Sequence, residues 1–264
     1  VQLYREAFGE LPGGLLTAEG SVSEELVPLL AECGLKWWVS DKEILAKSLG
    51  KDFLAPHELY RPYGLERNGK RVTMLFRDAE LSSARSSVYP PLGATRAAQD
   101  LLMRLYDIHA QSAEWEVPPL VVLVARAERL WDSYHKEGKE FLRFLCSELS
   151  KADWVKTVTV QEYLDQFPPE RDIENLWAGS WADGDFSAWI GEEEENLAWN
   201  YLLETRKSLS QAQGKVSAEK LSLAMEEIYL AESSHWFWWF GEDRSSPQGD
   251  RPSDRMFRRT LENV

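Results

Sequence analysis

Three carboxylate side chains stand where an apolar or extended stretch of the sequence gives way to polar residues: Glu19, Asp78 and Glu128. The carboxyl ends of parallel strands share one edge of an α/β sheet, so the three side chains could face one cleft. Two carboxyl groups about 5–5.5 Å apart can break a glycosidic bond with retention, one as nucleophile and one as proton donor. Sequence spacing does not fix that distance. Glu19 could instead simply add charge near a helix start, where the helix dipole favours an anion.

The sequence shows no clear pattern for a metal site, a phosphate-binding loop or a serine nucleophile. The four histidines are scattered and no Cys/His spacing matches a zinc site, so we expect no metal. No glycine-rich phosphate loop follows a predicted strand, and we expect no cofactor. A serine nucleophile with a positioned His and Asp cannot be assembled from the spacing.

The elements that would position these carboxylates alternate between strands and helices. Apolar runs predict strands at residues 35–40, 72–76 and 120–125, the last one buried on both faces. Residues 155–160 form either a strand or the lead into a short helix at 161–166. Helical spacing predicts helices at residues 24–33, 94–113 and 139–149, and a short one capped by Asp41. The alternation predicts a parallel sheet or barrel, and the few strands indicate that it is incomplete.

The sequence changes character at Pro168 and Pro169. Residues 172–190 are rich in Trp, Gly and Asp, and from Glu192 onward the apolar residues have helical spacing, with a last helix starting at Phe257. Residues 53–70 and 82–93 read as polar loops. We therefore expect sheet and helices in residues 1–168, a connecting segment at 169–190, and a helical domain at 191–264.

The composition limits the kinds of partner. The 264 residues carry a formal net charge of −14, which argues against nucleic acid and against an anionic membrane surface. A neutral ligand such as a sugar is compatible, and the 12 Trp offer aromatic faces for it, although Trp also fills cores. No apolar run approaches the ~18 residues of a membrane span. Cys33 and Cys146 are expected to be buried free thiols, as in a reducing, cytoplasmic compartment.

Several motifs resemble those of one known family. Residues 14–23, around Glu19, resemble the nucleophile motif of glycoside hydrolase family 57, which contains α-amylases, amylopullulanases and 4-α-glucanotransferases. The resemblance continues in the same order at residues 34–41, 59–63, 75–82, 178–181, 185–186, 189–191 and 234–243. It therefore covers nearly the whole chain and is nearest to the amylase and amylopullulanase branch.

The resemblance implies an α/β fold: a partial (β/α)7-type barrel followed by an α-helical C-terminal domain. Residues 1–168 would be the C-terminal part of the incomplete barrel, and a missing N-terminal barrel segment of the same protein would be its partner. The implied ligand is an α-glucan or maltooligosaccharide, and Glu19 occupies the nucleophile position. The implied substrate-binding residues are Trp38, Trp181, His235, Trp236, Trp238 and Trp239.

The chain departs from the family pattern at its second catalytic position. The position of the proton-donating Asp carries Arg126, and a guanidinium that is always protonated cannot donate a proton near neutral pH. Glu128 and Asp78 are the candidate substitute acids. His235 also replaces an Asp, Ser83 replaces an Asp, and Leu16-Thr17 replaces the usual Trp-Pro.

Three interpretations remain open at this point. The chain could come from an enzyme that cleaves α-1,4 or α-1,6 glucan by retention through Glu19, impaired because Arg126 replaces the acid. It could be a non-catalytic relative that binds α-glucan or regulates an amylase. It could also be a gene fragment without an independent role.

Overall fold

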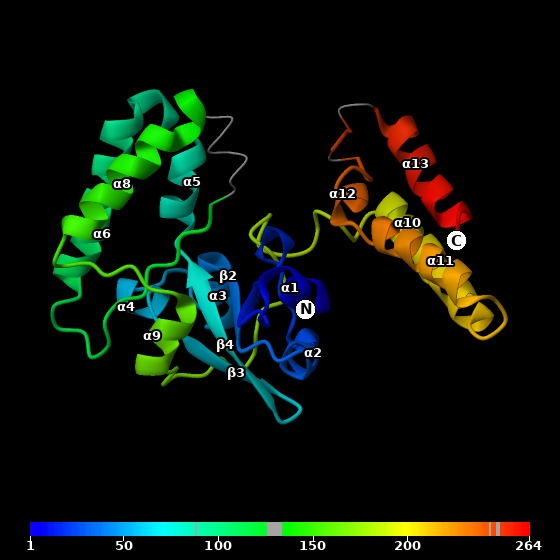
Figure 1. Ribbon diagram of the computed structural model, residues 1–264, viewed down its shortest axis with the longest axis horizontal. Coiled ribbons are helices and arrows are strands. Elements are labelled where there is room, and N and C mark those ends of the chain that lie inside the picture. The colour runs from blue at the N-terminus through cyan, green and yellow to red at the C-terminus, as the bar shows by residue number, and fades with distance from the viewer. Residues whose placement is uncertain (88, 126–133, 243, 247–248) are drawn as a thin grey trace. The chain divides into compact units, whose positions relative to one another are not determined.

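The structure, a computed structural model, describes residues 1–87, 89–125, 134–242, 244–246 and 249–264. The chain divides into two compact units, Val1–Trp181 and Ala182–Val264 (Figure 1). This division falls inside the segment 169–190 that the sequence marked as connecting. The three predicted domain bounds themselves stay a prediction.

The first unit is built on a four-stranded mixed sheet. Its strands are β1 (Gly14–Leu16), β2 (Trp37–Asp41), β3 (Tyr63–Arg67) and β4 (Lys70–Arg77), in the order β1-β2-β4-β3. β1, β2 and β4 are parallel, with Leu15 opposite Trp38 and Val39 opposite Leu75. The α/β class and the strands expected around residues 35–40 and 72–76 are confirmed. The carboxyl ends of the three parallel strands meet at one edge, which is where the candidate residues lie.

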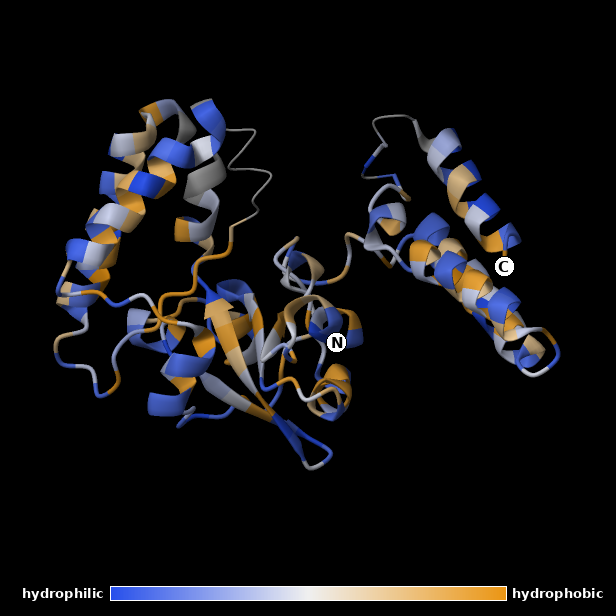
Figure 2. Ribbon diagram, in the orientation of Figure 1, coloured by the Kyte–Doolittle hydropathy of each residue, from blue (hydrophilic) through white to orange (hydrophobic). Residues whose placement is uncertain are grey.

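Strand β3 corrects the expectation of a polar loop at residues 53–70. It pairs antiparallel with β4 through a tight turn at Asn68 and Gly69, whose φ angles are 52° and 71°. Asn-Gly is the preferred pair for such a turn because both residues tolerate positive φ, so the signal was present in the sequence. Figure 2 shows polar residues at the tip of this hairpin and apolar residues along β4.

Helices and short turns connect the strands and cover the sheet. The helices of the first unit are α1 (Gln2–Phe8), α2 (Val27–Glu32), α3 (Lys42–Ser48), α4 (Pro56–Leu59), α5 (Ala79–Ser87), α6 (Ala94–Gln111), α8 (Lys139–Lys151) and α9 (Val160–Gln166). The predicted helices at 24–33, 94–113 and 139–149 correspond to α2, α6 and α8. Asp41 caps α3 as expected, because its carboxylate accepts a hydrogen bond from the Glu43 backbone N–H.

Three other expectations need correction. Residues 82–93 are not a continuous loop, since α5 extends to Ser87 and a single turn follows at Pro90–Leu92. Residues 120–125 are not a strand: Val122 makes one bridge to Arg77, and residues 121–124 are only half-buried. Residues 155–160 form no strand and instead lead into α9, which was the stated alternative.

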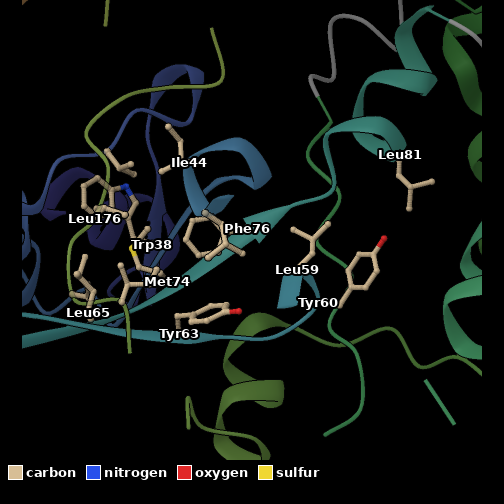
Figure 3. Close-up of a cluster of buried hydrophobic side chains, with 14 of the residues drawn as sticks. Trp38, Ile44, Leu59, Tyr60, Tyr63, Leu65, Met74, Phe76, Leu81 and Leu176 are labelled. Carbon is tan, nitrogen blue, oxygen red and sulfur yellow. The ribbon is translucent and has the colours of Figure 1, made fainter. Parts of the chain in front are cut away.

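A single apolar core holds the first unit together. Trp38, Met74 and Phe76 lie on the sheet and are 0–1% exposed, with Ile44 of α3 and Tyr63 of β3 beside them (Figure 3). Burying large apolar side chains contributes about 1.5–3 kcal/mol each, so this cluster fixes the strands from which the candidate residues project.

The second unit is helical and has its own core. It contains α10 (Glu193–Ala212), α11 (Ala218–Ala231), α12 (Ser234–Phe237) and α13 (Asp250–Glu262). Phe237 is fully buried and stacks on Trp199, with ring centroids 3.7 Å apart. The last helix begins at Asp250, well before the predicted start at Phe257, because Gly249 with φ 90° provides the turn ahead of it.

Two properties of the surface bear on the remaining expectations. Cys33 and Cys146 are free, as predicted, but both are exposed rather than buried, because each lies on the solvent side of its helical segment. No helix in the described part of the chain is long and apolar enough to cross a membrane. The cytoplasmic location stays a prediction.

Candidate active site

Glu19 lies in a tight turn directly after β1. The turn covers Ala18–Gly20, and Glu19 has φ 49° and ψ 24° while Gly20 has φ 61°. A left-handed conformation is easy for Gly but unfavourable for a side chain such as Glu. Residues held in this region are concentrated at functional sites, where the surrounding structure maintains them. The half-buried Glu19 is therefore placed by its surroundings rather than by its own backbone preference.

Side chains from the neighbouring strand hold this turn. The Thr17 hydroxyl donates to the Ser21 carbonyl and accepts a hydrogen bond from the Trp38 indole N–H at 3.3 Å. The Ser40 hydroxyl, which is buried, donates to the Gly20 carbonyl at 2.8 Å. Trp38 and Ser40 both belong to β2, so the strand next to β1 fixes both ends of the turn.

Trp181 reaches Glu19 from the other end of the unit's sequence. Its backbone N–H donates to the Glu19 carbonyl at 3.0 Å, and its indole N–H donates to Glu19 Oε2. A two-way backbone pairing of Val22 with Gly179, at 2.8 and 3.0 Å, aligns the two segments. The carboxylate of Glu19 thus has a dedicated donor, held by three backbone hydrogen bonds.

The Trp181 ring is itself held by residues at the ends of β1 and β4. Arg77, the last residue of β4, places Cζ 3.7 Å from the ring centroid. The backbone of Gly20 lies so close that a Cβ there would be 2.4 Å from Cε3 of Trp181. Only Gly fits at this point, because any larger residue would push the ring away from Glu19.

Asp41 anchors Arg77. Its Oδ2 accepts a hydrogen bond from Arg77 Nε at 2.5 Å, and its side chain is only 4% exposed. The two residues are paired in the register of β2 and β4, which brings them to the same edge of the sheet. We call Asp41, Arg77 and Trp181 the carboxylate support of Glu19.

Arg77 was not among the predicted site residues, and Asp41 was predicted only as a helix cap. The available signal was their position. Each ends or follows a predicted strand, at the same edge as Glu19.

Asp78, a candidate substitute acid, is used as a helix cap. It is 7% exposed, and its carboxylate accepts hydrogen bonds from the Tyr60 hydroxyl at 2.6 Å and from the Leu81 backbone N–H at 2.9 Å. Burial, and then the hydrogen bond to Asp78, raise the pKa of Tyr60 far above its ordinary value, so Tyr60 stays a donor. Arg126 and Glu128 lie outside the described residues.

The aromatic candidates fall into different settings. Trp38 is fully buried in the first core, and a fully buried ring has no face that a sugar could reach. His235, Trp236, Trp238 and Trp239 belong to the second unit, around α12. There His235 is exposed and the three tryptophans are half-buried, with Arg244 Cζ 4.1 Å from the ring centroid of Trp238. Among the described residues, no group of three or more His, Cys, Asp or Glu could hold a metal ion.

Comparisons with known proteins found a family model, a curated relative and several structures of similar fold. The model of the family "Glycosyl hydrolase family 57" matches residues 1–174. A Methanocaldococcus jannaschii protein named "Putative alpha-amylase" is 32% identical over 242 residues, covering 86% of this chain and 46% of that protein. The chain thus spans about half the length of this curated relative.

Several enzymes of known structure have a similar fold. They include an α-amylase from Thermotoga maritima, with a TM-score of 0.72 and 16% identity over 100% of this chain and 61% of that one. A branching enzyme from Pyrococcus horikoshii has a TM-score of 0.77 and 17% identity, over 98% of this chain and 58% of that one. A branching enzyme from Thermococcus kodakaraensis, in complex with glucose, has a TM-score of 0.76 and 17% identity, over 99% and 59%. At these identities the likeness concerns the fold.

Proposed function

Because this chain belongs to glycosyl hydrolase family 57, we propose that it is part of a protein that acts on α-glucan or maltooligosaccharide with Glu19 as the nucleophile. The observation that supports the proposal most strongly is the way in which the fold positions Glu19. Glu19 lies at the carboxyl edge of the parallel strands, and its backbone is held in an unfavourable conformation. Its carboxylate accepts a hydrogen bond from the indole N–H of Trp181.

The proposed reaction retains the configuration of the sugar. A Glu19 oxygen bonds to the anomeric carbon as the glycosidic bond breaks, and the leaving oxygen must then take up a proton. Water next attacks the glycosyl ester, loses a proton, and releases Glu19 as a carboxylate. The leaving oxygen lacks its usual proton donor, because Arg126 occupies the acid position in the sequence.

The loss of the acid sets the expected substrate preference. General acid catalysis is worth roughly 10²–10⁴-fold, so turnover of ordinary glucans would be lower by that factor. A leaving group that departs without a proton, such as fluoride, would escape the loss. Asp78 is a poor substitute, because both of its oxygens already accept hydrogen bonds that hold α5 and Tyr60.

We also propose that the four-stranded sheet is part of a (β/α)7-type barrel. The parallel pairs β1–β2 and β2–β4 and the site at their carboxyl edge support this assignment. The helical unit Ala182–Val264 would be the C-terminal domain of the same protein.

A second function is favoured by Arg126. A guanidinium at the acid position near Glu19 would pair with the carboxylate, and an ion pair suits ligand holding rather than cleavage. The alternative is therefore a non-catalytic relative that binds α-glucan or regulates an amylase.

The two functions can be separated with the full chain and two substrates. We expect α-maltosyl fluoride to be turned over and maltooligosaccharides to be cleaved far more slowly, with Glu19→Gln abolishing both reactions. The control is Glu32→Gln, a change at an exposed glutamate of α2. Binding of maltooligosaccharide without turnover of the fluoride would instead establish the second function. A folded chain that neither binds nor turns over either compound would overturn both.

A further inference from the structure

We propose that Trp181 is a positioning residue for Glu19 and not a platform on which a sugar stacks. The inference rests on the proposed function, since it assigns a role to a residue beside the nucleophile. It departs from the expectation, drawn from the sequence, that Trp181 binds the substrate together with the other site tryptophans.

Trp181 contacts Glu19 twice. The backbone N–H of Trp181 donates to the Glu19 carbonyl at 3.0 Å, and the indole N–H donates to the Glu19 carboxylate. Two contacts between the same two residues fix both the main chain and the side chain of Glu19. A carboxylate held in this way keeps a defined orientation toward the reacting carbon.

The Trp181 ring already has neighbours of its own in the fold. The Arg77 guanidinium lies over the ring at 3.7 Å, and the backbone of Gly20 touches its six-membered part. Stacking on a sugar requires an open ring face. The Arg77 guanidinium occupies the face over which it lies, so a sugar could not stack on that face.

Arg77 makes the indole N–H of Trp181 a stronger hydrogen-bond donor to Glu19. A cation within about 6 Å of a ring face is attracted to the π-electrons and draws them toward itself. The indole N–H becomes more positive and therefore a stronger donor to an anionic acceptor. The Arg77 guanidinium can polarise the ring because it is planar and always charged. Asp41 binds its Nε, which leaves the flat face of the guanidinium against the Trp181 ring.

A series of contacts connects α3 to the Glu19 carboxylate. The α3 backbone N–H of Glu43 fixes Asp41, Asp41 fixes Arg77, and Arg77 fixes the Trp181 ring. The path begins at the first turn of α3, passes through the ends of β2 and β4, and reaches the half-buried Glu19 carboxylate through the indole N–H of Trp181. The orientation of Glu19 is thereby tied to the rigid part of the fold.

The first test does not depend on activity. In the full chain labelled with ¹⁵N, the indole N–H resonance of Trp181 is assigned by its loss in Trp181→Phe. We expect it to move on Glu19→Gln and, by a comparable amount, on Arg77→Gln, and to stay in place on Glu32→Gln. A resonance unmoved by both Glu19→Gln and Arg77→Gln would overturn the proposal even if the protein hydrolyses glucan.

The second test separates positioning from sugar binding. Trp181→Phe keeps an aromatic ring and removes only the N–H donor. With α-maltosyl fluoride we expect kcat to fall about 10- to 100-fold while KM changes less than threefold. A platform would behave differently: Phe would largely preserve it, and Trp181→Ala would raise KM. A KM effect without a kcat effect would overturn the proposal, whereas absence of turnover in the unmodified chain would count against the proposed function alone.

Discussion

At the scale of single residues, the turn at Glu19 shows how much depends on its neighbour Gly20. Both residues adopt positive φ, but only Gly20 does so without steric cost. Gly20 also lies against the Trp181 ring, where there is no room for a Cβ. The single hydrogen atom of Gly20 thus permits both the turn and the approach of the donor to Glu19.

This double role predicts an unusually damaging substitution. Gly20→Ala should destabilise the chain by more than the roughly 1 kcal/mol expected from positive φ alone, because its Cβ would also collide with the Trp181 ring. Gly50→Ala is the matched control: Gly50 has φ 63°, and a Cβ there would meet nothing within 4 Å. Urea unfolding of both variants measures the difference. Equal losses of unfolding free energy would show that the ring is free to move aside.

The sequence identified some site residues but not their roles. The position of Glu19 after an extended segment was predictable from the glycines before it, whereas its left-handed backbone was not, because no residue pattern encodes strain at a glutamate. Asp78 was predicted at the end of a strand and lies there, yet its carboxylate caps α5. Trp38 looked like a ligand platform because burial cannot be read from residue type alone.

At the scale of elements, prediction succeeded where apolar periodicity was strong. Strands β2 and β4 and helices α6 and α8 follow from their patterns. Residues 120–125 have an equally strong apolar pattern but form no strand. Apart from the bridge between Val122 and Arg77, their backbone groups pair outside the sheet: Leu120 N–H donates to the Tyr60 carbonyl and Val124 N–H to the Ser82 hydroxyl. A pattern reports burial tendency and does not reveal whether a partner strand runs alongside.

The hairpin β3–β4 is joined to the rest of the unit by an ion pair that should respond to pH. The hydrogen bond from Arg67 of β3 holds the pKa of Glu24 below its ordinary value, against the opposing effect of burial. A depressed pKa in the folded state contributes stability above the ordinary pKa of about 4.3, and that stability is lost as pH falls through the lower value.

We therefore expect Glu24→Gln to destabilise the chain at pH 7 and to have progressively less effect below about pH 4. The side chain of Glu24 is 34% exposed, so solvent screening limits the difference to about 1 kcal/mol. Unfolding by urea at several pH values measures it, with Glu32→Gln as the control. A constant difference between the Glu24 variant and the unmodified chain across this range would contradict the assignment of the ion pair.

At the scale of the whole molecule, two separate cores account for the two units. The buried residues of Val1–Trp181 cluster around the sheet, and those of Ala182–Val264 cluster around Phe237 and Phe257. The sequence predicted the helical character of the second unit from apolar spacing. It could not reveal that residues from α10, α12 and α13 share one core, because that contact joins positions far apart in the chain.

Because each unit has its own core, we expect a substitution in one core to destabilise that unit and leave the other unit unchanged. Phe237→Ala removes a fully buried ring from the second core and should cost that unit about 3–5 kcal/mol. Hydrogen exchange should then rise across α10–α13 while β2 and β4 keep their protection. Phe141→Ala, at a 1% exposed residue of α8 that belongs to the first core, is the reciprocal variant and should raise exchange in the first unit while α10–α13 keep their protection. If Phe237→Ala deprotects β2 and β4 as strongly as α10, the two cores unfold together, and the support of Glu19 depends on the helical unit.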